Sequence, residues 1–365
     1  MKNHDRLPTH FFLLRIYFLF AICNALFSLS LTAQQASEFP FTKHTKRVLF
    51  LGNSITYAGT YITDIETYFI THYPKERIEF INEGLPSETV SGLSEPNHAD
   101  GKFPRPDLHE RLARVLAITK PDVVFACYGM NDGIYMPLNE ERFKAYQDGM
   151  HWLHDELEKT DAQQIVFLTP PVHDDPQLGT KGYNLVLDKY SQWLLEQEDS
   201  SNWKVADIHF PMTKYLEKER ANNPAFKLAD DGVHPGDLGH WLMAKAVLLY
   251  LDQPVRDHID MLSSINTFPH AKAIYDLVSE RQKVMKDAWL SAAGHKRPGM
   301  NEGIPLTEAR QVYDSIEVRI EALLKLRVVA DNNSSFIRRS FTDMKMYTAI
   351  VPGLFVWIRR GRAFL

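Results

Sequence analysis

Between residues 46 and 251, short apolar runs of strand length alternate with longer segments in which apolar residues recur at helical spacing. This alternation is typical of a parallel β-sheet covered by helices on both faces. The short runs lack alternating polar positions, as expected for strands that are buried on both faces. The predicted fold class is therefore α/β. The predicted strands are residues 48–51, 78–81, 123–127, 165–168 and 203–208, and the predicted helices are residues 61–72, 108–119, 138–159, 183–198 and 238–251.

The strand pattern stops after Leu251. Residues 271–293 and 307–326 are instead predicted to form two helices separated by a glycine-containing turn. In the second helix, apolar residues recur every three or four positions, which gives one apolar stripe that needs a packing partner. The first helix and the α/β domain are both candidate partners. The residues of the stripe are Val312, Ile316, Ile320 and Leu323.

The N-terminus has the layout of a secretory signal peptide. Lys2, Arg6 and Arg15 precede an apolar run at residues 16–31, and small residues near Ala33 offer a cleavage site. A secreted or periplasmic protein is therefore expected. An uncleaved anchor helix is the alternative, but the run is shorter than the ~20 residues that cross a bilayer. No stable membrane span is expected in the mature chain.

The C-terminal tail begins with a polar linker at residues 331–335 and continues into an apolar run at residues 346–358. That run is interrupted by Pro352 and Gly353, and it is too short to span a bilayer. A disordered tail is therefore favoured over a membrane-surface anchor. The predicted organisation is a signal peptide at residues 1–33, an α/β domain at 45–251, a helical extension at 252–330 and a tail at 331–365.

Two further features limit the chemistry and the partners of the chain. Of its two cysteines, Cys23 lies in the leader, so the mature chain keeps Cys127 alone and can form no internal disulfide. Ile22 precedes Cys23, where lipoprotein processing needs a small residue, so lipid attachment is not favoured. The formal net charge of -5 gives no broad basic field for nucleic acid. No nucleic-acid partner is expected, and the sequence does not indicate an oligomeric state.

Four short polar segments follow predicted strands or precede predicted helices. In an open α/β sheet, the functional site forms beyond the carboxyl ends of the strands, so these segments are where chemistry is expected. The segments are residues 52–56 (GNSIT), 82–87 (NEGLPS), 129–132 (GMND) and 231–234 (DGVH).

Three of these residues supply the parts of an activated serine nucleophile. A serine hydroxyl reacts poorly until a base removes its proton, and that base must be held in the correct tautomer by an acceptor. Ser54, His234 and Asp231 fit these roles in turn. Because Asp231 and His234 are three residues apart, one local turn can bring their side chains together.

Acyl transfer also needs hydrogen-bond donors for the negative oxygen of its tetrahedral intermediate. The candidate donors are the backbone N–H groups of Ser54 and Gly84 and the side-chain amide of Asn131. Gly84 lacks a Cβ and so allows close approach of a substrate, and Asn131 donates without carrying a charge.

The four segments, in this order, resemble the conserved blocks of the SGNH or GDSL-like hydrolases. The resemblance covers about residues 46–251 and implies a flavodoxin-like three-layer α/β/α sandwich that hydrolyses esters without a metal or other cofactor. It also implies that Ser54 is the nucleophile, that Gly84 and Asn131 are oxyanion donors, and that His234 is the base with Asp231 behind it. Asn53 stands where many members have aspartate, at a position with no role in proton transfer.

Four further residues are predicted to contact substrate: Tyr57 and Tyr128 beside these segments, Asp132 within one, and His173 after another predicted strand. Tyrosine rings can stack on a sugar, although packing in the core is the alternative for each. His173 begins a run of three possible metal ligands, but three consecutive residues cannot all face one ion. No metal site is predicted.

These observations predict a secreted serine esterase that removes short acyl groups, such as acetyl, from carbohydrates. The expected partner is a small-molecule or polysaccharide ester. A lysophospholipase or lipase is the alternative within the same class. A non-catalytic carbohydrate-binding protein on the same scaffold and a metal-dependent phosphoesterase are alternatives from other classes; the first would lack part of the triad, and the second needs a ligand cluster that the sequence does not contain.

Overall fold

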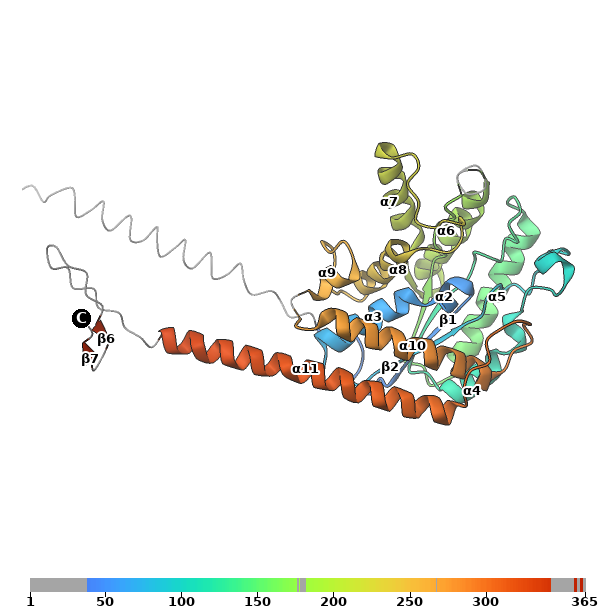
Figure 1. Cartoon of the computed structure of the whole chain (residues 1–365). Coiled ribbons are helices and arrows are strands. Elements are labelled where there is room, and N and C mark those ends of the chain that lie inside the picture. The colour runs from blue at the N-terminus through green and yellow to red at the C-terminus, as the bar shows by residue number, and fades with distance from the viewer. Residues whose placement is uncertain are drawn as a thin grey trace, which may run out of the picture. The chain divides into compact units, whose positions relative to one another are not determined.

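The computed structural model describes residues 38–175, 177, 182–266, 268–342, 358–359 and 362–363 (Figure 1). By its internal contacts, the chain divides into residues 1–40 and 41–365, and everything below concerns the second unit. The predicted signal peptide and most of the apolar run of the tail lie outside the described residues.

A five-stranded parallel sheet forms the centre of the fold, with the strand order β2-β1-β3-β4-β5. This order is that of flavodoxin-like folds, and it places the topological switch point, where the strand order reverses, between β1 and β3. The predicted α/β class with helices on both faces is confirmed. The strands are β1 (Arg47–Gly52), β2 (Glu79–Gly84), β3 (Val123–Cys127), β4 (Gln164–Leu168) and β5 (Lys204–Ala206).

The central strands are buried on both faces, as their continuous apolar sequence predicts. Val48, Leu49, Phe50 and Leu51 of β1 have no exposed surface. The Phe50 ring stacks on that of Phe125 in the neighbouring strand, with centroids 5.1 Å apart. The core therefore runs through the sheet rather than along one side of it.

Helices connect the strands and cover the sheet. Helices α3 and α8 pack against each other, and α5 and α6 pack on β4 and β5. Two of these helices were not expected from the sequence: the five-residue α2 and α7, whose start at His209 falls directly after a predicted strand. The helices of this part are α2 (Ser54–Ala58), α3 (Thr60–His72), α4 (Leu112–Thr119), α5 (Glu140–Glu158), α6 (Asn184–Ser201), α7 (His209–Asn222) and α8 (Asp237–Tyr250), with 3-10 turns η1 (His98–Gly101) and η2 (Leu108–Glu110).

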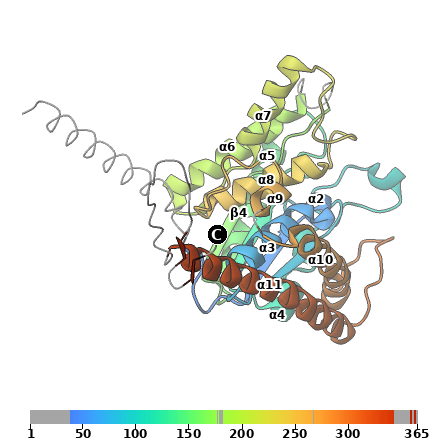
Figure 2. The same cartoon turned by 60° about the vertical axis from the view of Figure 1, so that its left-hand side comes forward.

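The C-terminal helices α10 (Ala271–Ala293) and α11 (Leu306–Thr342) lie side by side (Figure 2). Their contact buries Ile316 and Ile320 of the predicted stripe against Ile274 and Val278 of α10, so the predicted helix pair is confirmed. The short helix α9 (Met261–Ile265) precedes them. Helix α11 continues through residues 331–335, where a polar linker was predicted. Polar side chains do not prevent a helix, because its hydrogen bonds join backbone groups.

Helix α10 covers the edge of the sheet at β2. The Gln282 amide donates to the Phe80 carbonyl oxygen at 2.8 Å, and the Trp289 indole N–H donates to the Glu79 carboxylate at 3.2 Å. An uncovered edge strand presents unpaired backbone groups that invite aggregation. The extension therefore completes the α/β domain by covering this edge. None of the helices in the described part of the chain has both the length and the hydropathy of a membrane span.

Candidate active site

The carboxyl ends of three adjacent strands bring the polar segments together. In the sheet register, Gly52 of β1 lies opposite Gly84 of β2 on one side and Cys127 of β3 on the other. Ser54 begins α2 two residues after Gly52. The site is therefore built where an open α/β sheet places its ligands.

A sharp turn from β1 into α2 presents the Ser54 hydroxyl. A Cβ on Gly52 would lie 2.2 Å from Thr56 Oγ1 and 2.9 Å from the Cys127 carbonyl oxygen, so only glycine fits there. The Asn53 side chain accepts a hydrogen bond from the Ile55 N–H at 3.0 Å and caps the helix. Asn53, which stands where many family members have aspartate, therefore has a structural role as the N-cap of α2.

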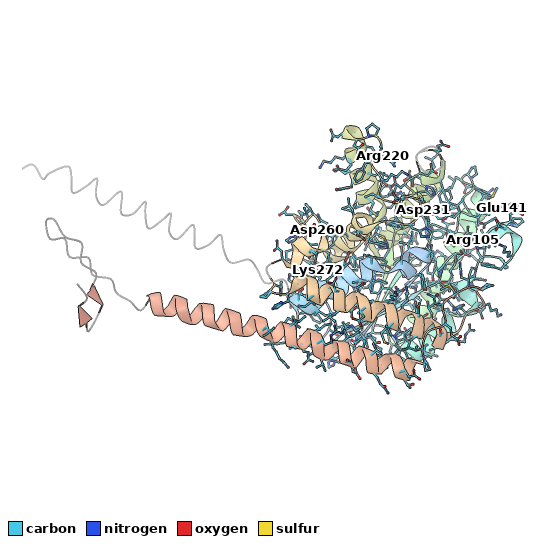
Figure 3. All side chains as sticks on the ribbon, in the orientation of Figure 1. Arg105, Glu141, Arg220, Asp231, Asp260 and Lys272 are labelled. Atoms are coloured by element: carbon cyan, nitrogen blue, oxygen red, sulfur yellow. The ribbon has the colours of Figure 1, made fainter. Side chains whose placement is uncertain are left out.

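Ser54, His234 and Asp231 form one continuous chain of hydrogen bonds (Figure 3 labels Asp231). His234 Nε2 lies 2.8 Å from Ser54 Oγ, and His234 Nδ1 lies 2.6 Å from Asp231 Oδ2. The two contacts use opposite nitrogens of one imidazole, which is the arrangement that lets a histidine take a proton from one partner while the other fixes its tautomer.

The Asp231 carboxylate also shapes the turn that carries His234. Its Oδ1 accepts the backbone N–H groups of Val233 at 2.9 Å and His234 at 2.8 Å. Partial burial acts to raise the pKa of Asp231, but the hydrogen bonds from the His234 ring and from these N–H groups outweigh it and lower the pKa to about 2. Asp231 is thus a carboxylate throughout the neutral range.

A second aspartate, which the sequence analysis considered only as a possible metal ligand, supports this turn. Asp174 is buried, and its Oδ2 accepts the backbone N–H groups of Leu228 and Ala229. Its own N–H donates to the Gly232 carbonyl at 2.7 Å, and its carboxylate pairs with Arg220 of α7. Asp174 therefore anchors the segment that leads into Asp231.

Gly84 occupies a different position from the one predicted. Its N–H donates to Asn82 Oδ1 at 2.9 Å, and the residue is buried. A Cβ there would lie 2.2 Å from the Tyr57 backbone nitrogen. The prediction that the Gly84 N–H is an oxyanion donor is therefore wrong, because that N–H is already bonded; Gly84 is needed so that α2 can pack closely on β2.

Three residues further along, Ser87 has a backbone conformation that usually belongs to glycine. Its φ of 70° lies in the left-handed region, which costs a residue with a Cβ roughly 1–2 kcal/mol. Ser87 is partly exposed, and no acceptor for its N–H occurs among the described residues. Nothing in the sequence signals this conformation, because serine is not a turn marker of the strength of glycine.

Asn131 lies against the same loop. Its Nδ2 donates to the Glu88 carbonyl at 3.1 Å, and its Oδ1 accepts from the Tyr135 hydroxyl at 3.1 Å. These two bonds orient the amide and leave one N–H of Nδ2 for another acceptor. Because Glu88 directly follows Ser87, this contact places the Asn131 amide next to the loop that carries Ser87.

Tyr128 and Asp132 are fully buried, so the prediction that they contact substrate is wrong. Tyr128 donates to Glu88 Oε2 at 2.7 Å. Asp132 accepts from the N–H groups of Val90 and Ser91, each at 2.9 Å, and so joins the β3 loop to the β2 loop. Both residues therefore support the loops that carry the site. Their position near the site in the sequence did not reveal that their side chains point into the core.

His173 and Tyr57 lie beside the site in different settings. His173 is only 2% exposed and lies under the Gly232 turn, 3.2 Å from where a Cβ on that glycine would stand. Tyr57 is partly exposed; its hydroxyl donates to Asp287 Oδ1 at 3.1 Å, and the Lys286 ammonium lies 3.8 Å from its ring centroid. Burial, followed by the negative Asp287, raises the pKa of Tyr57 to about 12. Of the four predicted substrate contacts, Tyr57 has the most accessible side chain.

A buried ionic cluster supports the β2 loop from below. Arg111 donates to Glu83 Oε2 at 2.9 Å and to Glu88 Oε1 and Oε2 at 2.6 and 2.8 Å. All three side chains are at most 1% exposed. Burial raises the pKa of Glu83, whereas Arg111 acts to lower it. The cluster fixes the chain on either side of Leu85 and Pro86.

Within the part of the chain that the structure describes, no group of three or more histidine, cysteine or acidic residues is placed to hold a metal ion. The run that begins at His173 is divided: Asp174 bonds backbone N–H groups and Arg220, and the Asp175 N–H donates to His173 Nδ1 at 3.3 Å.

Comparison with solved structures finds similar chains at low identity. The diltiazem-metabolizing enzyme BT4096 from a gut microbe is 22% identical, with a TM-score of 0.48 over 60% of this chain and 49% of that chain. The acetylxylan esterase Axe2 from Geobacillus stearothermophilus, as a catalytic mutant, is 21% identical, with a TM-score of 0.45 over 57% of this chain and 96% of that one. The acetyl xylan esterase AlAXEase is 22% identical, with a TM-score of 0.43 over 56% and 98%.

No curated protein sequence matches the chain significantly. A family model does: that of the GDSL-like Lipase/Acylhydrolase family matches residues 50–242, more than half of the chain. This range contains all five strands except the first residues of β1, together with Ser54, Asp231 and His234. The chain therefore belongs to the GDSL-like lipase/acylhydrolase family.

Proposed function

We propose that this protein is a serine esterase in which Ser54 is the nucleophile, His234 the general base and Asp231 the residue that orients the base. The observation that carries the proposal is the hydrogen-bonded chain from Ser54 Oγ through both nitrogens of His234 to Asp231 Oδ2. Membership of an acylhydrolase family agrees with it.

In the first half of the reaction, Ser54 Oγ attacks the ester carbonyl carbon while its proton moves to His234 Nε2. The imidazolium that forms is stabilised by the carboxylate of Asp231. The tetrahedral intermediate then collapses: the bond from carbon to the alcohol oxygen breaks, and the alcohol leaves with the proton from His234. An acyl group remains on Ser54.

In the second half, His234 takes a proton from water, and the hydroxide attacks the acyl carbon. Collapse of the second intermediate breaks the bond to Ser54 Oγ, which regains its proton from His234. A carboxylic acid is released, and the enzyme returns to its starting state without a cofactor.

Each intermediate carries a negative oxygen, for which we propose three donors: the N–H of Ser54, the N–H of Ser87 and the free N–H of the Asn131 amide. Neither backbone group has an acceptor among the described residues. The Ser87 N–H replaces the Gly84 N–H of our sequence-based prediction because the latter is bonded to Asn82. Removing one such donor in other enzymes costs about 10²–10³ in kcat.

For the substrate, we propose short acyl groups, such as acetyl, on a carbohydrate alcohol, and we propose that the enzyme acts after export. The leader sequence supports export. A partly exposed aromatic ring three residues after the nucleophile supports contact with a sugar, because Tyr57 and Ser54 lie one turn apart on α2.

The decisive experiment compares wild-type protein with Ser54→Ala on p-nitrophenyl acetate and on acetylated xylooligosaccharides, with released acetate as the readout. We expect turnover by the wild type, none above background by the variant, and equal melting temperatures. Full activity in Ser54→Ala would reject the assignment. A series of p-nitrophenyl esters of increasing chain length tests the substrate, since a preference for long chains would favour a lipase or lysophospholipase.

A further inference from the structure

A residue from the C-terminal extension reaches the loop that carries the proposed oxyanion donors. Arg297 lies in the segment between α10 and α11, outside the residues that match the family model. Its Nε donates to the Pro86 carbonyl oxygen at 2.8 Å. Pro86 directly precedes Ser87, so the contact falls on the peptide group that also contains the Ser87 N–H.

The geometry of a peptide group gives this contact a consequence. In a trans peptide, the C=O and N–H bonds point in opposite directions. Because the Pro86 C=O points at Arg297, the Ser87 N–H points away from it. The guanidinium therefore fixes the direction of that N–H, although it does not touch it.

The neighbouring carbonyls of the loop are held in the same way. Arg105 Nη1 donates to the Ser87 carbonyl at 3.4 Å, and Asn131 Nδ2 donates to the Glu88 carbonyl at 3.1 Å. Three successive carbonyls thus each accept a side-chain donor, and the left-handed conformation of Ser87 is held from both sides. Such over-determination is what allows an unfavourable backbone conformation to persist.

We propose that Arg297 is a positioning residue of the oxyanion hole: it orients the peptide between Pro86 and Ser87 and polarises it, so that the Ser87 N–H becomes a stronger donor. This inference rests on the proposed esterase function. A charged donor on the carbonyl of a peptide withdraws electron density from its nitrogen, and linked hydrogen bonds strengthen one another.

The surroundings of Arg297 fit this role. Among the described residues, no carboxylate forms an ion pair with its guanidinium, so its charge is not neutralised locally. Its other bonds are to the Pro298 carbonyl and to Met300, and its guanidinium lies 5.5 Å from the centroid of the Phe103 ring. Arg297 is partly buried, and this burial lowers the pKa of its guanidinium.

The test compares Arg297→Met and Arg297→Lys with Lys296→Met as the matched control. Lys296 is the adjacent cation; it is exposed and lies 3.7 Å from Glu110. For p-nitrophenyl acetate, we expect Arg297→Met to lower kcat about 10- to 100-fold, with KM within about twofold of the wild type. This effect is smaller than that of removing one oxyanion donor, because the Ser87 N–H is still present. Arg297→Lys should lie between, and Lys296→Met should match the wild type.

A second readout distinguishes positioning from general structural support. Sulfur accepts hydrogen bonds more weakly than oxygen, so an intact oxyanion hole favours an oxoester over the matching thionoester. We expect the ratio of kcat/KM for the oxoester to kcat/KM for the thionoester to fall at least threefold in Arg297→Met. The same ratio should stay unchanged in Lys296→Met.

A wild-type kcat in Arg297→Met would overturn this inference and leave the proposed function standing. A lower kcat with an unchanged ester ratio and a lower melting temperature would also overturn it, because the residue would then be structural. Absence of Ser54-dependent turnover in the wild type would instead overturn the proposed function, and this inference with it.

Discussion

Asp231 binds His234 twice: Oδ2 contacts the ring nitrogen at 2.6 Å, and Oδ1 accepts the backbone N–H of the same residue at 2.8 Å. One carboxylate therefore sets both the tautomer of the imidazole and the path of the chain that carries it. These two effects can be separated by substitution, because an asparagine can still offer one oxygen.

We predict that Asp231→Asn lowers kcat by about 10⁴ while the melting temperature stays near that of the wild type. The asparagine oxygen can keep the bonds to the backbone N–H groups of Val233 and His234, but its NH₂ group faces His234 Nδ1 and favours the wrong tautomer. Steady-state kinetics and thermal unfolding provide the measurements. Asp231→Ala, which loses both functions, should lower activity and melting temperature together; equal melting temperatures for the two variants would contradict this account.

Gly84 and Ser87 make a second pair of predictions. Gly84→Ala should destabilise the protein by about 1–3 kcal/mol and reduce activity, because its Cβ would overlap backbone atoms of Tyr57 and Thr56 and displace α2. Ser87→Gly should keep near wild-type activity, since glycine adopts a φ of 70° without strain and keeps the N–H. Denaturant unfolding and kcat measure both effects. The assignment of the donor fails if Gly84→Ala is stable and inactive.

The sequence predicted the parallel sheet well, because strands such as β1 are buried on both faces and must be apolar throughout. It also pointed to Ser54, Asp231 and His234. Each lies in a short polar segment, and the segments in this order match the pattern of one hydrolase family. The aspartate and histidine meet within one turn, so their contact needs little knowledge of the fold.

What the sequence could not predict depends on contacts between distant segments. Whether the Gly84 N–H is free depends on the rotamer of Asn82, and the burial of Asp132 depends on where residues 90–91 pass. The contact of Arg297 with Pro86 joins residues 211 apart along the chain. No periodicity or local motif contains such information.

The buried cluster around Arg111 leads to a stability prediction. Arg111→Met should lower the free energy of unfolding by about 3–5 kcal/mol, because Glu83 and Glu88 would remain buried without their cation. Tyr128→Phe removes only a hydrogen bond to Glu88 and should cost about 1.5–3 kcal/mol. Urea unfolding at pH 7 measures both. A smaller effect for Arg111→Met than for Tyr128→Phe would show that the cluster does not hold the β2 loop as described.

His240 gives a prediction for the dependence of stability on pH. Its ring is buried and lies parallel to that of Tyr61, with centroids 6.0 Å apart, and its Nδ1 has no partner among the described residues. Burial, followed by repulsion from His234, lowers the pKa of His240 to about 4. An unfolded histidine has a pKa of about 6.5.

Between these two values, the unfolded chain binds a proton that the folded chain does not. The free energy of unfolding therefore falls as the pH drops from about 6.5 to about 4, by an amount on the order of 3 kcal/mol from this residue. His240→Phe keeps a ring beside Tyr61 but does not titrate. We expect the difference in unfolding free energy between pH 7 and pH 4.5, measured by urea denaturation, to be smaller in the variant than in the wild type. Equal differences in the two proteins would mean that His240 is protonated in the folded state, and its buried, neutral setting would then be wrong.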